Sequence, residues 1–495
     1  MSELLALLEN REAGVVRQRR GRLSFTYTDA WRDAPGAYPL SLSMPLIASE
    51  HSHAAIDAFL WGLLPDNEFV LRRWAQRFHV SPRSAFALLA KVGEDCAGAV
   101  QFVRPERRET LLDGATGGID WLTESDVANR LRGLRTDAGS GRADHDTGQF
   151  SLAGAQPKTA LCFDGQRWGV PHGREPTTHI LKPWAGEYDG HAENEHLCLS
   201  LARALGLPAS RSEVRRFEDV TALVVERYDR VHVATLANAK TALAAAKAAE
   251  AAMHAASAGA GATAMASRAA AEAANASAAA RTLLAFAKTT STYRAHQEDI
   301  CQSLSIHPLL KYQNDGGPGP RQIMDLLRTH VSGAERRVSG AERQRDAGAL
   351  TAFDEDAATF IDALILNWLI GGTDAHGKNY SILIGGGRLA RLAPLYDLAS
   401  IFAYPNIDPD KAKLAMKIGG EYRLRAVGLS QWRQLAAEIG FDPGVLTNRV
   451  RALAGELPDR LADEIRRLSA AGIAHPVIDI MARELSRRAR DIAKL

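Results

Sequence analysis

The stretch Asn367–Ile384, NWLIGGTDAHGKNYSILI, constrains the fold more than any other part of the chain. Its apolar first part predicts a helix that ends at Gly371–Gly372. A run of small and polar residues follows, and a β-prone segment begins at Tyr380. The pattern therefore predicts a helix, a tight polar turn and a strand, with Asp374 and Asn379 on the turn.

A third polar side chain, Asp397, follows this turn after the strand-like segment RLAPLY. Phosphoryl transfer needs a carboxylate that accepts the proton of the attacking hydroxyl, and an amide oxygen and a second carboxylate that bind Mg²⁺. Protein kinases have the same spacing in their H-R-D-x-x-x-x-N loop, although here His376 follows the aspartate and YDLAS replaces DFG. Asp374 and Asn379 could also simply cap turns, and their spacing alone does not decide between the two interpretations.

A kinase also needs a lysine on a strand to meet the ATP phosphates and a helix glutamate to hold that lysine. Lys182 lies at the end of the β-prone segment THILKPW, and burial of its ammonium group requires a counter-charge. The helix predicted next opens with Glu193 and Glu195, and either could pair with the lysine. A strand-end lysine whose head group reaches solvent is the alternative interpretation.

The segment SLAGAQPKT, upstream of this strand, is a candidate phosphate loop. Ala153, Gly154 and Ala155 let backbone N–H groups approach phosphate oxygens, and Lys158 lies just beyond them. The chain has no Walker A match. Downstream, the strand VVERYDR leads into a polar turn where an interlobe hinge is expected, with Glu226–Tyr228 presenting backbone groups to adenine. These elements follow one another in the order that a two-lobed kinase requires.

Composition bounds the remaining possibilities. A chain of 495 residues predicts roughly two or three packed units. Its net charge of +2 indicates no basic stripe for nucleic acid. We expect a cytoplasmic protein that does not enter a membrane, because the sequence has no signal peptide and no apolar run of about 18 residues. The scattered cysteines are expected to be buried thiols: Cys96, Cys162, Cys198 and Cys301.

The predicted fold class is α+β: a two-lobed kinase-like fold with a small N-terminal α/β domain and an all-helical C-terminal lobe. Residues 1–110 form the N-terminal domain, and the polar, Gly/Asp-rich residues 111–149 are interpreted as a linker. Residues 150–235 form the N-lobe, 236–292 an alanine-rich insertion, and 293–495 the C-lobe with the catalytic loop.

The alanine-rich segment Ala239–Thr282 predicts two helices in a hairpin that turns near Gly259–Gly261. A low-complexity insertion without a function is the alternative. The near-duplicate SGAERRVSGAERQR at 332–345 predicts a solvated loop.

Several segments closely resemble those of HipA-type serine/threonine kinases, the toxins of bacterial toxin–antitoxin systems. In the two lobes they are SLAGAQPKTAL, THILKP, ENEHLCLSLA, ALVVERYDR, HQEDICQ, KYQNDGGPG, WLIGGTDAHGKNYSI and LYDLAS. In the N-terminal domain they are YPLSLSMPL, FLWGLLPDNE and VGEDCAGAVQF. The resemblance covers most of the chain.

The resemblance implies a role for each matching residue. It makes Asp374 the catalytic base and Ser151 the site of autophosphorylation, which we expect to expel the loop and silence the enzyme. The residues expected to bind Mg²⁺ are Asn379 and Asp397. The residues expected to bind ATP are Ala153, Gly154, Ala155, Lys158, Lys182, Glu226, Tyr228, His376 and Lys378.

The resemblance also implies partners. Family members phosphorylate aminoacyl-tRNA synthetases, best known for glutamyl-tRNA synthetase, and a small helix-turn-helix antitoxin neutralises them. Operator DNA is bound only through the antitoxin complex. This chain departs from the family in its longer alanine-rich insertion and in Pro157, where glutamate is often found. A small-molecule or lipid kinase and a catalytically silent scaffold for antitoxin and DNA are the alternative functions.

Overall fold

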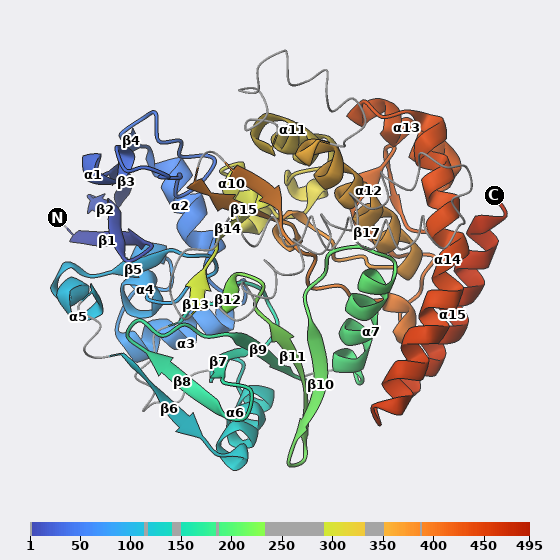
Figure 1. The fold of residues 1–495 in the computed structure, drawn as a ribbon, viewed down its shortest axis with the longest axis horizontal. Coiled ribbons are helices and arrows are strands. Elements are labelled where there is room, and N and C mark those ends of the chain that lie inside the picture. Colours follow the sequence, from blue (N-terminus) through green and yellow to red (C-terminus); the bar gives the residue numbers. More distant parts are fainter. Residues whose placement is uncertain are drawn as a thin grey trace, which may run out of the picture.

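The computed structural model describes residues 2–112, 117–140, 150–184, 188–232, 292–331, 351–386 and 389–495. In Figure 1 the N-terminal domain lies at the upper left, a second sheet lies below it, and helices fill the right side. The predicted helical hairpin within 239–282 and the charged repeat at 332–345 lie outside the described residues. Among the described helices, none combines the length and the apolar character needed to span a bilayer.

The N-terminal domain is a five-stranded antiparallel sheet, ordered β4-β3-β2-β1-β5, with helices packed against it. Its strands are β1 (Ser2–Leu8), β2 (Arg11–Arg19), β3 (Arg22–Tyr27), β4 (Glu50–His51) and β5 (Gln101–Val103). Its helices are α1 (Asp29–Arg32), α2 (His53–Gly62), α3 (Glu68–Phe78), α4 (Ala85–Val92) and α5 (Arg108–Leu112). Helix α2 stops before Pro65, and Asn67 caps α3 by accepting hydrogen bonds from Phe69 N and Val70 N. The turn between the two helices therefore has a defined shape.

The second sheet has six strands in the order β10-β11-β9-β7-β8-β6. Its strands are β6 (Gly118–Leu122), β7 (Thr159–Phe163), β8 (Trp168–His172), β9 (His179–Pro183), β10 (Ser212–Phe217) and β11 (Val220–Glu226). Helix α6 (Glu124–Thr136) packs against β9, β10 and β11, and helix α7 (His191–Ala204) packs against β10 and β11. The strand predicted in THILKPW, the strand predicted to lead through VVERYDR into a turn and the helix predicted to carry Glu193 and Glu195 are confirmed.

The interpretation of 111–149 as a linker is wrong for its central part. Residues 118–122 form β6, which pairs with β8, and residues 124–136 form α6. Thr123 and Asp126 make a capping box at the start of that helix. The polar composition was misleading because α6 buries only one narrow face, centred on Val127, Leu131 and Leu134.

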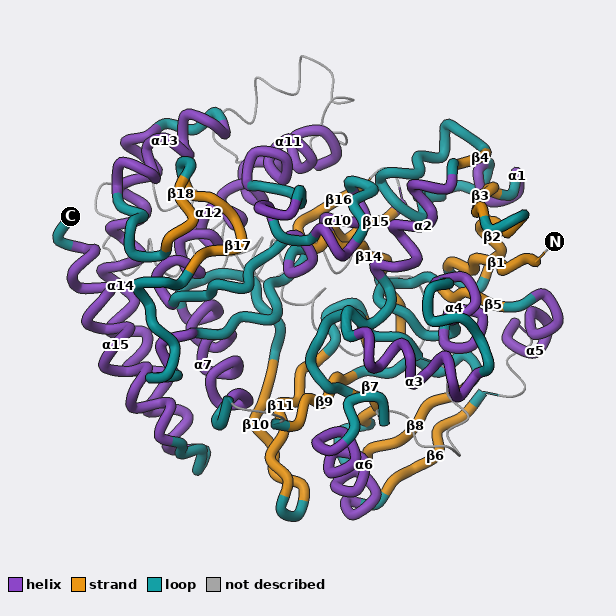
Figure 2. The backbone as a smooth tube through the Cα atoms, turned by 180° about the vertical axis from the view of Figure 1, so that it is seen from behind, coloured by secondary structure: helices purple, strands orange, loops and turns teal. Residues whose placement is uncertain are grey.

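The C-terminal part combines helices with small sheets. Its helices are α10 (Ile300–Ser303), α11 (Pro320–His330), α12 (Ala352–Ile370), α13 (Leu429–Ile439), α14 (Pro443–Ala470) and α15 (Pro476–Ala493). The strands are β12 (Arg230–His232), β13 (Thr292–Arg294), β14 (His296–Asp299), β15 (Ser381–Gly385), β16 (Leu389–Leu392), β17 (Lys413–Ile418) and β18 (Glu421–Arg423). From behind, α13–α15 form one flank and β1–β4 the opposite one (Figure 2).

The α+β class is confirmed, whereas the expectation of an all-helical C-terminal lobe is wrong. Strands β14, β15 and β16 form a three-stranded sheet, and β17 pairs with β18. The β-branched residues Ile382 and Ile384 are buried, and the backbone groups of β15 pair with β14 on one side and with β16 on the other.

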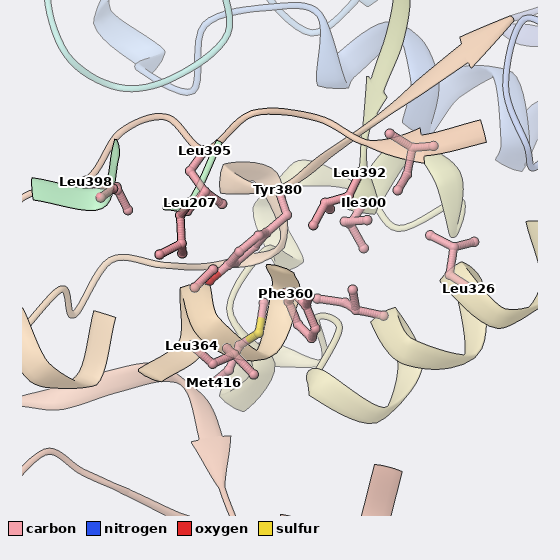
Figure 3. Packing of buried hydrophobic residues seen from close by; sticks show 14 of the residues in the cluster. Leu207, Ile300, Leu326, Phe360, Leu364, Tyr380, Leu392, Leu395, Leu398 and Met416 are labelled. Atoms are coloured by element: carbon pink, nitrogen blue, oxygen red, sulfur yellow. The ribbon is translucent and has the colours of Figure 1, made fainter. Parts of the chain in front are cut away.

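The main hydrophobic core lies directly beside the turn that carries Asp374. Helix α12 contributes Phe360 and Leu364, and the ring of Tyr380 meets Phe360 edge to face with centroids 5.2 Å apart (Figure 3). Ile300 and Met416 belong to the same cluster. Dense packing of this kind resists displacement, and it holds the end of α12 and the start of β15 in place.

Candidate active site

One cavity of about 720 Å³ lies between the N-terminal domain, the six-stranded sheet and the C-terminal helices. It brings together nearly all of the residues that the sequence marked. Those lining it are Ala153, Gly154, Ala155, Lys158, Lys182, Glu226, Tyr228, Asp374, His376, Lys378, Asn379 and Asp397. Ser151, the first residue of the candidate phosphate loop, is not among the lining residues, because its side chain is fully buried.

The turn after α12 is held by its own hydrogen bonds. Gly371 ends the helix with a φ of 68°, and a Cβ there would lie 2.6 Å from the ring of Phe402. The Asn379 side chain donates from Nδ2 to the carbonyl of Asp374 at 2.8 Å. This bond orients the amide and leaves Oδ1 of Asn379 as the atom able to bind a cation. The tight polar turn predicted from the sequence is confirmed.

Asp374 has a neighbour that the sequence analysis did not mark. The hydroxyl of Tyr312 donates to Oδ1 of Asp374 at 2.6 Å, and the Tyr312 ring meets the His376 ring edge to face. Burial lowers the pKa of His376 to about 4, and the smaller opposing effect of the Asp374 carboxylate does not offset it, so the imidazole is neutral at pH 7. Among the described residues, Nδ1 of His376 has no hydrogen-bond partner.

Lys182 at the end of β9 makes the central ion pairs of the cavity. Its Nζ lies 2.8 Å and 3.0 Å from the two carboxylate oxygens of Glu195 and 3.1 Å from Oδ1 of Asp397. Burial opposes the charged form of Lys182, but Asp397 and Glu195 hold the pKa of the lysine above its ordinary value. The open choice between Glu193 and Glu195 is decided for Glu195, since residues two apart on a helix point to different faces.

Asp397 adopts an unusual backbone conformation. Its φ of 58° is in the left-handed region, which asparagine and aspartate tolerate better than most side chains. Burial opposes ionisation of Asp397, yet the ammonium groups of Lys182 and Lys158 hold the pKa of its carboxyl well below the usual range. The strained backbone thus presents an ionised carboxylate to the cavity beside Lys182.

In the candidate phosphate loop, the side chain of Lys158 folds back and binds a backbone carbonyl of the same loop. Lys158 Nζ donates to the carbonyl of Ala153 at 2.7 Å, and a Cβ on Gly154 would lie 2.5 Å from that nitrogen. Gly154 also has a φ of 100°, so this position requires glycine. Burial, reinforced by the charge of Lys182, lowers the pKa of Lys158 to about 8.

The expected hinge residues also line the cavity. The N–H of Glu226 donates to Arg211 O, and the N–H of Arg227 donates to Thr178 O. Tyr228 stacks on Tyr396 at 5.9 Å and donates its hydroxyl to Oε1 of Gln297. Glu226 and Tyr228 therefore border the cavity from a firmly held backbone.

Sequence reasoning missed several polar groups that line the cavity. They are Asp66, Gln297, Asp299 and Lys311. Tyr312, which was not predicted either, is not a lining residue but donates a hydrogen bond to Asp374. All of them fall in the segments LLPDNE, HQEDICQ and KYQNDGGPG, which carried the family resemblance without any assigned role. The available signal was a run of polar residues directly after an apolar helix end or strand.

The donor atoms fit magnesium better than a metal that needs a complete protein cage. Asn379 offers an amide oxygen and Asp397 a carboxylate, the hard oxygen ligands that Mg²⁺ prefers. Among the described residues no three His, Cys, Asp or Glu side chains gather into a metal site. Mg²⁺ commonly binds in this way, through one or two protein oxygens completed by phosphate oxygens and water.

Comparisons with known proteins agree with this geometry. A family model described as the HipA N-terminal domain matches residues 4–103, and one described as the HipA-like C-terminal domain matches residues 150–290 and 239–465. The Y4mE protein of Sinorhizobium fredii is 31% identical over 96% of this chain and 94% of its own length. The serine/threonine-protein kinase toxin HipA of Shewanella oneidensis is 26% identical over 92% of this chain and 89% of its own length.

A solved structure has the same fold. It is described as the Shewanella oneidensis toxin–antitoxin system HipA, HipB and operator DNA complex, and it covers 99% of both chains with a TM-score of 0.67 at 21% identity. The C-terminal family model spans more than half of the sequence, and the N-terminal model covers most of the rest. The chain therefore belongs to the HipA family.

Proposed function

We propose that the protein is an ATP- and Mg²⁺-dependent serine/threonine protein kinase that acts as the toxin of a toxin–antitoxin module. One observation carries the proposal. The Lys182–Glu195–Asp397 ion-pair cluster shares a single cavity with Asp374, Asn379 and the glycine-containing phosphate loop. Protein kinases use a strand lysine, a helix glutamate, a base and a metal-binding aspartate for phosphoryl transfer.

Each side chain has a task in this scheme. Asp374 accepts the proton of the substrate hydroxyl. Oδ1 of Asp374 already accepts a hydrogen bond from the hydroxyl of Tyr312, which shows that a hydroxyl group can approach this oxygen. Lys182, fixed by Glu195, holds phosphate oxygens of ATP, while Asn379 and Asp397 hold the cation. Bound Mg²⁺ would offset the negative charge of the phosphate groups.

We propose the partners on the same basis. The substrate is a protein hydroxyl, with an aminoacyl-tRNA synthetase as the expected target, and a helix-turn-helix antitoxin neutralises the enzyme. The similar Shewanella HipA was solved with HipB and operator DNA, which supports binding of DNA through the antitoxin complex. A small-molecule kinase would need the same site residues, so the N-terminal family match favours the toxin. The presence of every catalytic group argues against a silent scaffold.

Incubation with γ-labelled ATP and Mg²⁺ tests the proposal. We expect label on Ser151 of the purified protein and on a protein in a bacterial lysate. Label on a small molecule or lipid alone would favour the alternative kinase class. The complete absence of labelled protein would refute the assignment as a protein kinase.

Replacement of Ser151 by aspartate should reduce phosphoryl transfer by about tenfold or more. The Ser151 hydroxyl is fully buried and donates to the carbonyl of Leu63 at 2.7 Å. A carboxylate cannot donate this bond, and burial of its charge without a partner is unfavourable, so the loop should leave the site. Steady-state rates of Ser151→Asp are compared with those of Ser151→Ala, which removes the bond without adding charge. Wild-type turnover by Ser151→Asp would contradict the proposed regulation.

The burial of Ser151 has a second consequence for autophosphorylation. Its N–H also donates to the carbonyl of Asp95 at 2.9 Å, so both ends of the residue are tied to the N-terminal domain. A hydroxyl in this position is inaccessible to ATP. Autophosphorylation therefore requires the phosphate loop to leave its docked position first.

A further inference from the structure

The turn Leu63–Asn67, between α2 and α3 of the N-terminal domain, contacts both halves of the proposed kinase site. On one side it holds the phosphate loop through its backbone and one amide. Leu63 O accepts from Ser151 Oγ at 2.7 Å, Asp66 N donates to Gly154 O at 3.2 Å, and Asn67 Nδ2 donates to Ala155 O at 3.4 Å.

On its other side the turn binds the C-terminal lobe through one carboxylate. Oδ1 of Asp66 lies 2.5 Å from Nζ of Lys378, and Oδ2 lies 2.8 Å from Nζ of Lys311. Lys378 is 4% exposed, Lys311 15% and Asp66 13%. Burial of Asp66 opposes its ionisation, but Lys378 and Lys311 hold the pKa of the carboxyl below its ordinary value. The three groups form a largely desolvated ion cluster.

Both lysines adjoin residues that the reaction uses. Lys378 lies between Asp374 and Asn379 on the catalytic loop. The backbone carbonyl of Lys311 accepts a hydrogen bond from the N–H of Gly377, on the same loop, at 3.2 Å. The next residue, Tyr312, donates its hydroxyl to Asp374. Movement of either lysine side chain would therefore disturb the placement of Asp374, the proposed base, and of the Asn379 amide, the proposed metal ligand. Asp66 supplies the counter-charge that both lysines share.

We propose that Asp66 is a positioning residue for phosphoryl transfer, by which the N-terminal domain completes the kinase site: its carboxylate holds Lys378 and Lys311 around Asp374. The proposal rests on the proposed kinase function. Without the carboxylate, the two ammonium groups lose their shared partner and turn toward the next available anion, the ATP phosphates. The nucleotide then binds more tightly, but the catalytic loop loses the geometry that transfer requires.

Replacement of Asp66 by asparagine separates this role from the docking of the phosphate loop. The amide keeps the size of the side chain, and the contacts to Ser151, Gly154 and Ala155 use other atoms of the turn. We expect kcat to fall about 10- to 100-fold, while the non-hydrolysable analogue AMP-PNP binds about three- to tenfold more tightly. A variant damaged only in its folding would instead lose both activity and affinity.

Two matched variants complete the experiment. Asp66→Glu retains the charge and should recover kcat to within about threefold to fivefold of wild type. Glu68→Gln makes the same acid-to-amide change two positions along, at an exposed residue that pairs with Arg72, and should behave as wild type. Calorimetric binding of AMP-PNP and transfer from labelled ATP are measured on the full chain.

The outcomes distinguish this inference from the proposed function. Unchanged kcat in Asp66→Asn, or equal loss in Asp66→Glu and Asp66→Asn, would overturn the positioning role while the kinase assignment stands. If the wild-type protein transfers no phosphate, the proposed function fails. Binding of AMP-PNP still decides the question in that case, because unchanged or weaker binding by Asp66→Asn shows that its carboxylate does not restrain the two lysines.

Discussion

Replacement of Asp374 by asparagine should lower the rate of phosphoryl transfer by about 10²- to 10⁴-fold, the usual contribution of a general base. The amide keeps the shape of the side chain and can still accept the Tyr312 hydrogen bond, but it cannot take the proton of the substrate hydroxyl. The loop backbone around Asn379 is held by other groups, including the Asp374 carbonyl, so the fold should persist. Single-turnover transfer from γ-labelled ATP to Ser151 measures the effect.

Two controls make the Asp374 experiment specific. Asp325→Asn changes an exposed carboxylate on α11 that pairs at the surface with nearby Arg328, and it should leave the rate unchanged. AMP-PNP affinity of Asp374→Asn should stay within about threefold of wild type, because the base acts on the hydroxyl and not on the nucleotide. A variant that retains full transfer would exclude Asp374 as the base.

Replacement of Asp95 by asparagine should destabilise the protein by about 3–5 kcal/mol, the range for breaking a buried ion pair. Asp95 is 6% exposed, and it accepts from Thr177 N at 3.0 Å, Thr177 Oγ1 at 2.7 Å and Arg230 Nη2 at 2.8 Å. Arg294 pairs with the same carboxylate, and Asp229 is bound to Arg227 and Arg230. Loss of the Asp95 charge leaves several buried guanidinium groups with too few partners.

Calorimetry measures this effect as a lower melting temperature, by roughly 3–5 °C, because the entropy of unfolding of a 495-residue chain is large. Asp29→Asn is the matched control, because Asp29 is 88% exposed and pairs with Arg32 only at the surface. A melting temperature within about 2 °C of wild type would show that the cluster does not hold the N-terminal domain to the six-stranded sheet.

The same cluster predicts a pH dependence. Burial opposes ionisation of Asp95, but Arg294, Arg230 and Arg227 hold the pKa of its carboxyl well below the usual range. Because the folded pKa is depressed, the stabilisation is fully present above the pKa of the unfolded chain, about 4, and is lost as pH falls toward the folded value. The difference in melting temperature between wild type and Asp95→Asn should therefore shrink below about pH 4.

The order of polar and apolar residues along the chain predicted much of the site, because the main elements of the site are short and are determined by residues close together in the sequence. The glycine end of α12, the turn that carries Asp374 and Asn379, and the strand that carries Lys182 all depend on neighbours in the chain. Their predicted positions agree with the structure. The hydrophobic periodicity of α6 is weak because this helix buries only one face. Its polar composition suggested a linker, and the prediction for this segment was therefore wrong.

The sequence by itself determined which chemical groups the chain carries and the order in which they occur, because motifs and periodicity report on residues that are close along the chain. Tertiary structure alone decided that Glu195 and not Glu193 meets Lys182, that Tyr312 covers Asp374, and that Asp66 reaches Lys378 across 312 positions. Such contacts depend on how the domains pack, and no local pattern encodes the choice of partner. The turn that carries Asp374 and Asn379 was therefore predictable, whereas the contacts that the N-terminal domain makes with it were not.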